Sequence, residues 1–160
     1  MYSVQFAELN RKNFNSYGKL IEVPVGTKPD IKTDTVQFWK QQAIIAMGES
    51  IEVGVLKVKK QEMIFNELEN HFNTPTILIS LDGDFIIPLA PVQDEIPSAD
   101  KVVAFKVPKF QMLVLAEKCW HGTTYPVDQE EITLLVIFKK NSLENDTVYE
   151  KLDQDCKVVY

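Results

Sequence analysis

The two histidines of the chain, His71 and His121, each stand beside other side chains that could take part in chemistry. His71 ends the segment 66–71, Asn-Glu-Leu-Glu-Asn-His, which also contains Glu67 and Glu69. In an extended strand these two carboxylates and His71 would project from one face. In a helical turn, Glu67 and His71 would instead be neighbours four positions apart. Either arrangement lets a carboxylate orient an imidazole, the minimum equipment for general acid–base chemistry, although such a polar run is also typical of a solvated loop.

The second candidate is the segment 119–122, Cys-Trp-His-Gly, which follows an expected strand over residues 112–116. Trp120 would supply an apolar wall and His121 a proton carrier. The alternative is a Trp120 packed in the core with an exposed His121 beside it. Cys119 has no histidine at a spacing that suggests a nucleophile pair, so we expect an ordinary reduced thiol there.

The small number of histidines also limits the metal sites that the chain can form. A site of three imidazoles and a carboxylate cannot be assembled from one chain. His71 and His121 with Glu67 or Glu69 remain a possible ligand set, but we expect no tightly bound metal and no cofactor. The chain has neither of the glycine-rich phosphate-binding motifs, so nucleotide-driven chemistry is not expected.

The composition favours one ordinary domain over residues 1–160. The chain has 17 Lys+Arg against 23 Asp+Glu, a net charge of -6, which disfavours nucleic acid as a partner. Arg11 is the single arginine, so an anionic ligand would be held by lysines or backbone amides. No apolar run reaches the roughly 20 residues of a membrane span, and the first residues lack the pattern of a signal peptide. We therefore expect a cytoplasmic protein with no membrane partner and a small-molecule substrate.

Short strands dominate the rest of the pattern, which predicts an all-β barrel or sandwich with minor short helices. Asp82-Gly83 between two apolar runs predicts a hairpin. Asn13 is expected to cap a helical turn over residues 14–17 that ends at Gly18, and residues 37–47 fit either helix or strand. Strands are expected at 51–58, 76–81, 85–87, 102–107, 112–116 and 132–138, with weaker ones at 123–125 and 157–160. The side chains expected to point inward are Val53, Val55, Ile77, Ile79, Phe85, Ile87, Val114, Leu134 and Val136.

The order of these segments resembles the ureidoglycolate lyase family, once called ureidoglycolate hydrolase, over nearly the full chain. The matching pieces are residues 14–18 (Phe-Asn-Ser-Tyr-Gly), residues 66–71, the Asp82-Gly83 turn with Pro88 to Pro91, and Trp120-His121 before an acidic tail. The family's motifs read His-Glu-Leu-Glu-x-His and Trp-His after an upstream His. In this chain Asn66 occupies the position of the first histidine of the first motif. Ala116 occupies the position of the histidine upstream of the Trp-His motif.

The resemblance implies a cupin-like double-stranded β-helix, a jelly-roll barrel, that forms a homodimer; exposed strand edges that need covering also favour association. It implies cleavage of ureidoglycolate to glyoxylate and urea, a late step of allantoin and purine catabolism. His121, His71, Glu69 and Glu67 would be catalytic, with Trp120 and Asn66 binding substrate. The histidines are expected to converge on one pocket at the barrel mouth. Because two imidazoles are replaced, a non-catalytic module that binds a small carboxylate or sugar-like ligand is the alternative.

Overall fold

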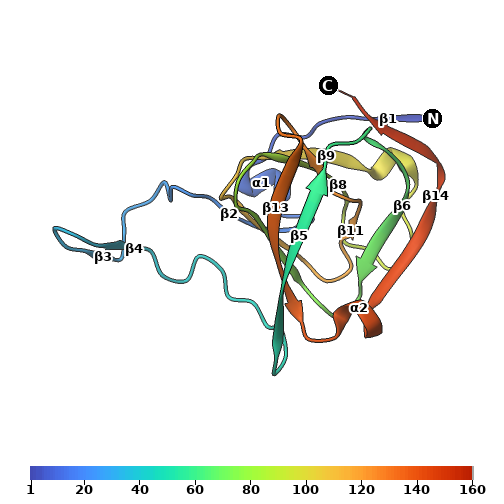
Figure 1. Cartoon of the computed structure of the whole chain (residues 1–160). Coiled ribbons are helices and arrows are strands. Elements are labelled where there is room, and N and C mark those ends of the chain that lie inside the picture. Colours follow the sequence, from blue (N-terminus) through green and yellow to red (C-terminus); the bar gives the residue numbers. More distant parts are fainter. Residues whose placement is uncertain (160) are drawn as a thin grey trace.

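The computed structural model describes residues 1–159 and is built almost entirely of strands (Figure 1). The described helices are one-turn elements, α1 (Arg11–Phe14), α2 (Ser142–Asn145) and the 3-10 turn η1 (Ala99–Lys101). None of them is long and apolar enough to cross a membrane. The strands are β1 (Tyr2–Val4), β2 (Gly18–Ile21), β3 (Ile31–Lys32), β4 (Gln37–Phe38), β5 (Ile51–Lys59), β6 (Ile64–His71), β7 (Thr76–Ser80), β8 (Phe85–Ala90), β9 (Val103–Val107), β10 (Met112–Leu115), β11 (Trp120–His121), β12 (Tyr125–Pro126), β13 (Glu131–Lys139) and β14 (Thr147–Val158).

These strands form two curled sheets that face each other. The seven-stranded sheet has the order β1-β14-β6-β11-β8-β12, with β9 on the other edge of β8, and the five-stranded sheet has the order β2-β10-β7-β13-β5. Pairing is antiparallel except between β1 and β14. Strand β8 is buried along its whole length because its two faces contribute to different apolar clusters. Phe85, Ile87 and Leu89 pack between the sheets, whereas Ile86 and Ala90 lie under the N-terminal segment and η1. The expected all-β class is confirmed.

Most expected strands are present, but some local expectations are wrong. The first helix begins one turn earlier than expected, because Asn10 rather than Asn13 is its N-cap and accepts a hydrogen bond from the Asn13 N–H. Gly18 does not end a helix; it begins β2, with φ at 150° and its Cα facing the Val114 carbonyl. Residues 37–47 contain only the two-residue β4. The strand expected at 157–160 is the end of the longer β14, and Tyr160 lies outside the described residues.

The hairpin expected at Asp82-Gly83 is also wrong. Strands β7 and β8 do not pair; β7 lies between β10 and β13 in one sheet and β8 lies in the other. The connection is held instead from β13, where the Thr133 N–H donates to Asp82 Oδ1 over 2.8 Å. Space beside Ile132 is so limited that a Cβ at Gly83 would lie 2.7 Å from its Cγ2 atom. Close packing of the connection on β13, rather than a positive φ, therefore explains the glycine.

Several residues of the five-stranded sheet face the opposite way from expectation. Val53 and Val55 are 58% and 68% exposed, and their neighbours Glu52 and Gly54 line an interior cavity. Ile77 and Ile79 lie on the outer face of β7, and Val114 is buried on the outer face of β10. The expectation fails because both faces of this sheet are rich in apolar residues, so hydrophobicity does not identify the inner one. Phe85, Ile87, Leu134 and Val136 do point into the core, as expected.

An arm over residues 22–50 leaves the body after β2 and returns at β5, with the β3–β4 hairpin at its far end (Figure 1). This arm is not among the elements expected from the sequence.

Candidate active site

Strand β6 places the acidic and basic groups of residues 66–71 on one face. Glu67, Glu69 and His71 alternate with Leu68 and Asn70, so the extended alternative is the observed one. Leu68 belongs to the apolar cluster on the outer side of the seven-stranded sheet. The other face looks into the space between the sheets, where Glu67 is exposed, Glu69 half-buried and His71 buried.

The short strand β11 brings His121 to the same place. His121 pairs with Glu69 of β6 on one side and with Leu89 of β8 on the other. Directly opposed residues of an antiparallel pair put their side chains on the same face, so His121 faces inward with Glu69. The two imidazoles, far apart in the sequence, lie with their ring centroids 5.4 Å apart.

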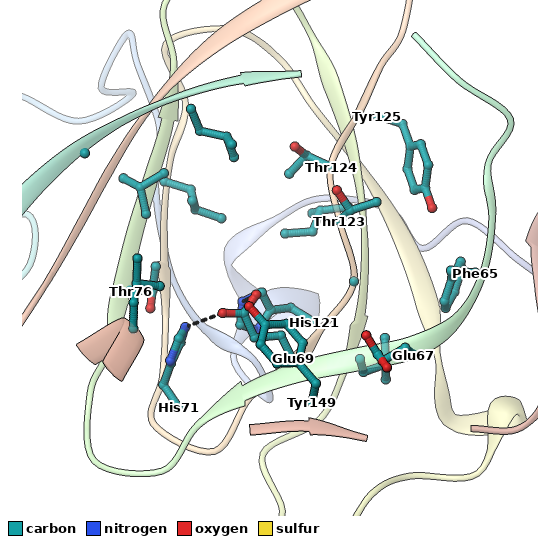
Figure 2. A pocket seen from close by; sticks show the side chains of 18 of the residues that line it. Phe65, Glu67, Glu69, His71, Thr76, His121, Thr123, Thr124, Tyr125 and Tyr149 are labelled. Carbon is teal, nitrogen blue, oxygen red and sulfur yellow. Dashed lines mark ion pairs between the residues drawn. The ribbon is translucent and has the colours of Figure 1, made fainter. Parts of the chain in front are cut away.

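One carboxylate joins the two rings (Figure 2). Glu69 Oε1 lies 3.3 Å from His71 Nε2, and Glu69 Oε2 lies 3.7 Å from His121 Nε2. Because each oxygen faces a different imidazole, a proton on either ring is within reach of the same carboxyl group.

Hydrogen bonds on the far side of each ring determine where its proton lies. His121 Nδ1 is 3.2 Å from the Cys119 carbonyl, and His71 Nδ1 is 3.3 Å from the Asp146 carbonyl. The Thr147 hydroxyl, 3.2 Å from His71 Nδ1, donates its own proton to the Ser142 carbonyl, so it also accepts from the ring. Carbonyl oxygens only accept, so both Nδ1 atoms carry hydrogen and both Nε2 atoms of the neutral rings present a lone pair.

Burial favours the uncharged form of every group in this cluster. It lowers the pKa of His121 to about 4, and it lowers the pKa of His71, an effect that the neighbouring His121 strengthens and Glu69 opposes. Burial raises the pKa of the Glu69 carboxyl, against the effects of His71 and of a hydrogen bond from the Tyr149 hydroxyl. Two Nε2 lone pairs facing a bare carboxylate would repel it, so the arrangement favours a proton between Glu69 and His71.

The cluster lies in a cavity of ≈ 670 Å³ between the sheets. Glu52, Glu67 and Glu69 line it, and within residues 1–159 its lining contains no lysine or arginine. Of the two expected kinds of donor for an anionic ligand, lysines and backbone amides, this lining therefore offers no lysine.

Three hydroxyl groups of the cavity lining are buried and have no hydrogen-bond partner. They belong to Thr76, Thr124 and Tyr125, which are each no more than 4% exposed. Figure 2 shows Thr76 beside His71, with Thr124 and Tyr125 across the cavity. A buried hydroxyl without a partner is costly, so a water molecule or a polar ligand in the cavity would be stabilised by these groups. These three residues are not among the site residues expected from the sequence, because isolated Thr and Tyr residues carry no recognisable pattern.

Trp120 does not lie in the wall of this cavity. It pairs with Ala90 and faces the outer cluster of the seven-stranded sheet, fully buried, where its ring packs against Phe72. Its indole Nε1 donates to the Gln93 carbonyl. The alternation of the two-residue β11 sends Trp120 and His121 to opposite faces, so a role for Trp120 in substrate binding is not supported.

The two positions where the family motifs have histidine also lie away from the cluster. Asn66 is exposed at the edge of the cavity, and by alternation its side chain lies on the other face of β6 from Glu67 and Glu69. Ala116 lines a separate groove on the outer side of the five-stranded sheet. Imidazoles at these positions would not join the pair formed by His71 and His121.

Glu69, His71 and His121 are also the residues that could hold a metal ion, since their donor atoms all lie within 4.8 Å of one another. Three protein donors are the number found in catalytic zinc sites, and the hydrogen-bonded Nδ1 atoms leave the Nε2 lone pairs free for coordination. The donor set therefore fits a divalent cation. Cys119 does not take part: it is buried and burial strongly raises its pKa, consistent with the expected ordinary thiol.

The fold defined by these sheets is the cupin fold. A dTDP sugar isomerase from Desulfovibrio desulfuricans G20 matches with a TM-score of 0.52 and 12% identity, over 85% of this chain and 83% of that chain. A sugar 3,4-ketoisomerase from Thermoanaerobacterium thermosaccharolyticum matches with a TM-score of 0.44 and 15% identity, over 82% and 83%. Bacillus subtilis oxalate decarboxylase matches with a TM-score of 0.45 and 17% identity over 62% of this chain, which spans only 24% of the decarboxylase chain.

The family is identified by sequence. The model of the ureidoglycolate lyase family matches residues 1–159, so the chain belongs to that family. A comparison with curated proteins found no match.

Proposed function

We propose that this protein cleaves ureidoglycolate to glyoxylate and urea by general acid–base catalysis. The observation that carries the proposal is the position of Glu69 between His71 and His121, with its two carboxylate oxygens 3.3 Å and 3.7 Å from their Nε2 atoms. Family membership supports a lyase reaction on a small molecule.

The reaction needs two proton transfers and no oxidant or water. Ureidoglycolate is a carbinolamine: its hydroxyl and its ureido nitrogen are attached to the same carbon. The hydroxyl loses its proton and becomes the carbonyl of glyoxylate, while the carbon–nitrogen bond breaks and the nitrogen leaves as urea after gaining a proton. A base and an acid on either side of this carbon are therefore sufficient.

The cluster provides both groups. His121 is neutral near pH 7 because burial lowers its pKa to about 4, so its Nε2 can accept the hydroxyl proton. Glu69, beside it, stabilises the imidazolium that forms. The proton held between Glu69 and His71 is available to the departing urea nitrogen. Glu67, exposed on the same face of β6, lies toward the cavity edge, where its carboxylate can accept hydrogen bonds from the N–H groups of the ureido end.

The substrate's own carboxylate requires donors, and the cavity lining offers neutral ones. Thr76, beside His71 (Figure 2), has an unpartnered buried hydroxyl that can donate to it.

The proposal is tested by incubating the purified protein with ureidoglycolate and measuring glyoxylate and urea. We expect the two products in equal amounts, and a fall in kcat on the order of 10²–10⁴-fold for Glu69→Gln, the usual contribution of a general acid–base group. Glu150→Gln is the matched control, because Glu150 is exposed on the neighbouring strand β14 outside the cavity lining. Absence of glyoxylate from the wild-type reaction would reject the proposal.

The second candidate function is a non-catalytic module that binds a small polar ligand in the same cavity. The unpartnered hydroxyls favour it, since they can serve binding without turnover. Binding of glyoxylate measured by calorimetry, with no turnover of ureidoglycolate, would identify this function.

A further inference from the structure

The strand β14 carries one side chain opposite each acidic or basic residue of the β6 face. The pairs are Thr147 with His71, Tyr149 with Glu69, and Lys151 with Glu67. Directly opposed residues of an antiparallel pair put their side chains on the same face. Hydrogen bonds join the first two pairs: the Thr147 hydroxyl accepts from the His71 ring, and the Tyr149 hydroxyl donates to the Glu69 carboxylate. This face of β14 is therefore part of the site.

The third pair, Lys151 and Glu67, is open. Both side chains are exposed, and among residues 1–159 neither forms an ion pair or a hydrogen bond. Glu67 lines the cavity, and the register places Lys151 beside it, with about 5 Å between the Cβ atoms of such a pair. An ammonium donor and a carboxylate acceptor therefore stand side by side at the edge of the cavity, and the protein itself uses neither.

A terminal carbamoyl group fits such a pair. Its carbonyl oxygen accepts and its NH2 group donates along the same edge, as in the amide of an asparagine side chain. A lysine ammonium only donates and an ionised carboxylate only accepts, so each can bind one half of this edge. A carboxylate ligand would be repelled by Glu67, and an ammonium ligand would be repelled by Lys151. The pair therefore favours a neutral group that has both a donor and an acceptor.

We propose that Lys151 and Glu67 together bind the terminal carbamoyl group of the substrate. Lys151 Nζ donates to its carbonyl oxygen, and the Glu67 carboxylate accepts from its NH2 group. The choice of ligand rests on the proposed function, in which the ureido end lies toward Glu67. Figure 2 shows Glu67 on the other side of Glu69 from His71, which leaves the His71 side for the substrate carboxylate. Lys151 is then a specificity-determining residue that lies outside the cavity lining itself.

Calorimetry with three ligands that cannot be cleaved tests the proposal. Ureidoacetate has the whole carbamoyl group but lacks the hydroxyl that becomes the carbonyl of glyoxylate. N-acetylglycine keeps the carbonyl and has a methyl group in place of the terminal NH2. Glycolate has a carboxylate and a hydroxyl but neither half of the carbamoyl edge. The wild-type protein should bind ureidoacetate about tenfold more tightly than N-acetylglycine, the effect of one hydrogen bond to a charged group.

Two variants separate the two contacts. Lys151→Met removes the ammonium group and should weaken ureidoacetate and N-acetylglycine by about tenfold each relative to glycolate. Glu67→Met should weaken ureidoacetate alone by about the same factor relative to the other two ligands. Lys59→Met is the control and should leave all three affinities unchanged, because Lys59 is exposed on the same face of β5 as Val53 and Val55. Both tested side chains are exposed, so the variants should fold, which circular dichroism verifies.

The three ligands distinguish recognition of the carbamoyl group from a general attraction of anions. If Lys151→Met weakened glycolate as much as the other two ligands, the lysine would act only by its charge and the proposal would be overturned. Equal binding of ureidoacetate and N-acetylglycine by the wild-type protein, or no measurable binding of ureidoacetate, would also overturn it. These outcomes are separate from turnover. A protein that binds as predicted and releases no glyoxylate from ureidoglycolate would lose the proposed function and keep this inference.

Discussion

Glu69 and His121 are direct partners across the antiparallel pair of β6 and β11, and this single register position creates the cluster. Strand β11 has only two residues, and the other one, Trp120, anchors it in the outer apolar layer. A fully buried Trp120 therefore fixes the position of the His121 ring on the opposite face of the strand. Trp120, expected to bind substrate, lies instead on the opposite face of the strand that it shares with His121.

Replacement of either imidazole should impair catalysis. We expect His121→Ala to lower kcat on the order of 10²–10⁴-fold, since His121 Nε2 is the proposed acceptor of the hydroxyl proton. His71→Asn should also lower kcat, because an amide can donate to the Asp146 carbonyl but cannot exchange a proton with Glu69. Steady-state kinetics on variants that are folded by circular dichroism would measure both. Unchanged turnover in the two variants would make the pair structural.

The stability of the metal-free protein should fall as the pH drops from about 6.5 to about 4. In the unfolded chain His121 binds a proton near pH 6.5, whereas in the folded state burial lowers its pKa to about 4, so the unfolded state binds more protons in this window. A difference of this size corresponds to about 3 kcal/mol at the acid end. The lowered pKa of His71 acts in the same direction, and the raised pKa of Glu69 acts in the opposite one.

Urea unfolding of the chelator-treated protein at several pH values would measure this loss. His121→Gln should show a clearly shallower decrease than the wild-type protein, because glutamine does not titrate. The same slope in both proteins would show that His121 is not the group responsible.

Proton transfer alone is sufficient for the proposed reaction, so dialysis against a chelator should leave turnover unchanged. Elemental analysis before and after dialysis would verify that metal was removed. Loss of turnover that Zn²⁺ or Mn²⁺ restores would contradict this prediction and would make Glu69, His71 and His121 ligands rather than an acid–base group.

Gly18→Ala should destabilise the fold by about 3 kcal/mol or more. Gly18 has φ at 150°, and an added Cβ would lie 1.9 Å from the Val114 carbonyl oxygen, so β2 could not keep its pairing with β10. Gly26→Ala is the matched control, because nothing lies within 4 Å of its Cβ position. Chemical denaturation of both variants would measure the difference, and equal stability would contradict the prediction.

Alternation along β6 was sufficient to predict that Glu67, Glu69 and His71 share a face if the segment is extended. Which strand lies beside them could not be predicted, because the pairing of β6 with β11 depends on the path of the whole chain. The prediction that the side chains of Val53 and Val55 point into the core is wrong for a related reason. The inner side of β5 lines the cavity and carries Glu52 and Gly54, whereas Ile51, Val53 and Val55 make the outer side the more hydrophobic one.

The cavity lining carries Glu52 and Glu67 and has no compensating lysine or arginine among residues 1–159. In the proposed reaction urea is neutral and glyoxylate is an anion, so these carboxylates would repel only one of the two products. The same charges would oppose entry of the anionic ureidoglycolate and speed exit of glyoxylate. Under the proposal, the site gives up affinity for its substrate and avoids strong product inhibition, and added salt should lower KM by screening the carboxylates.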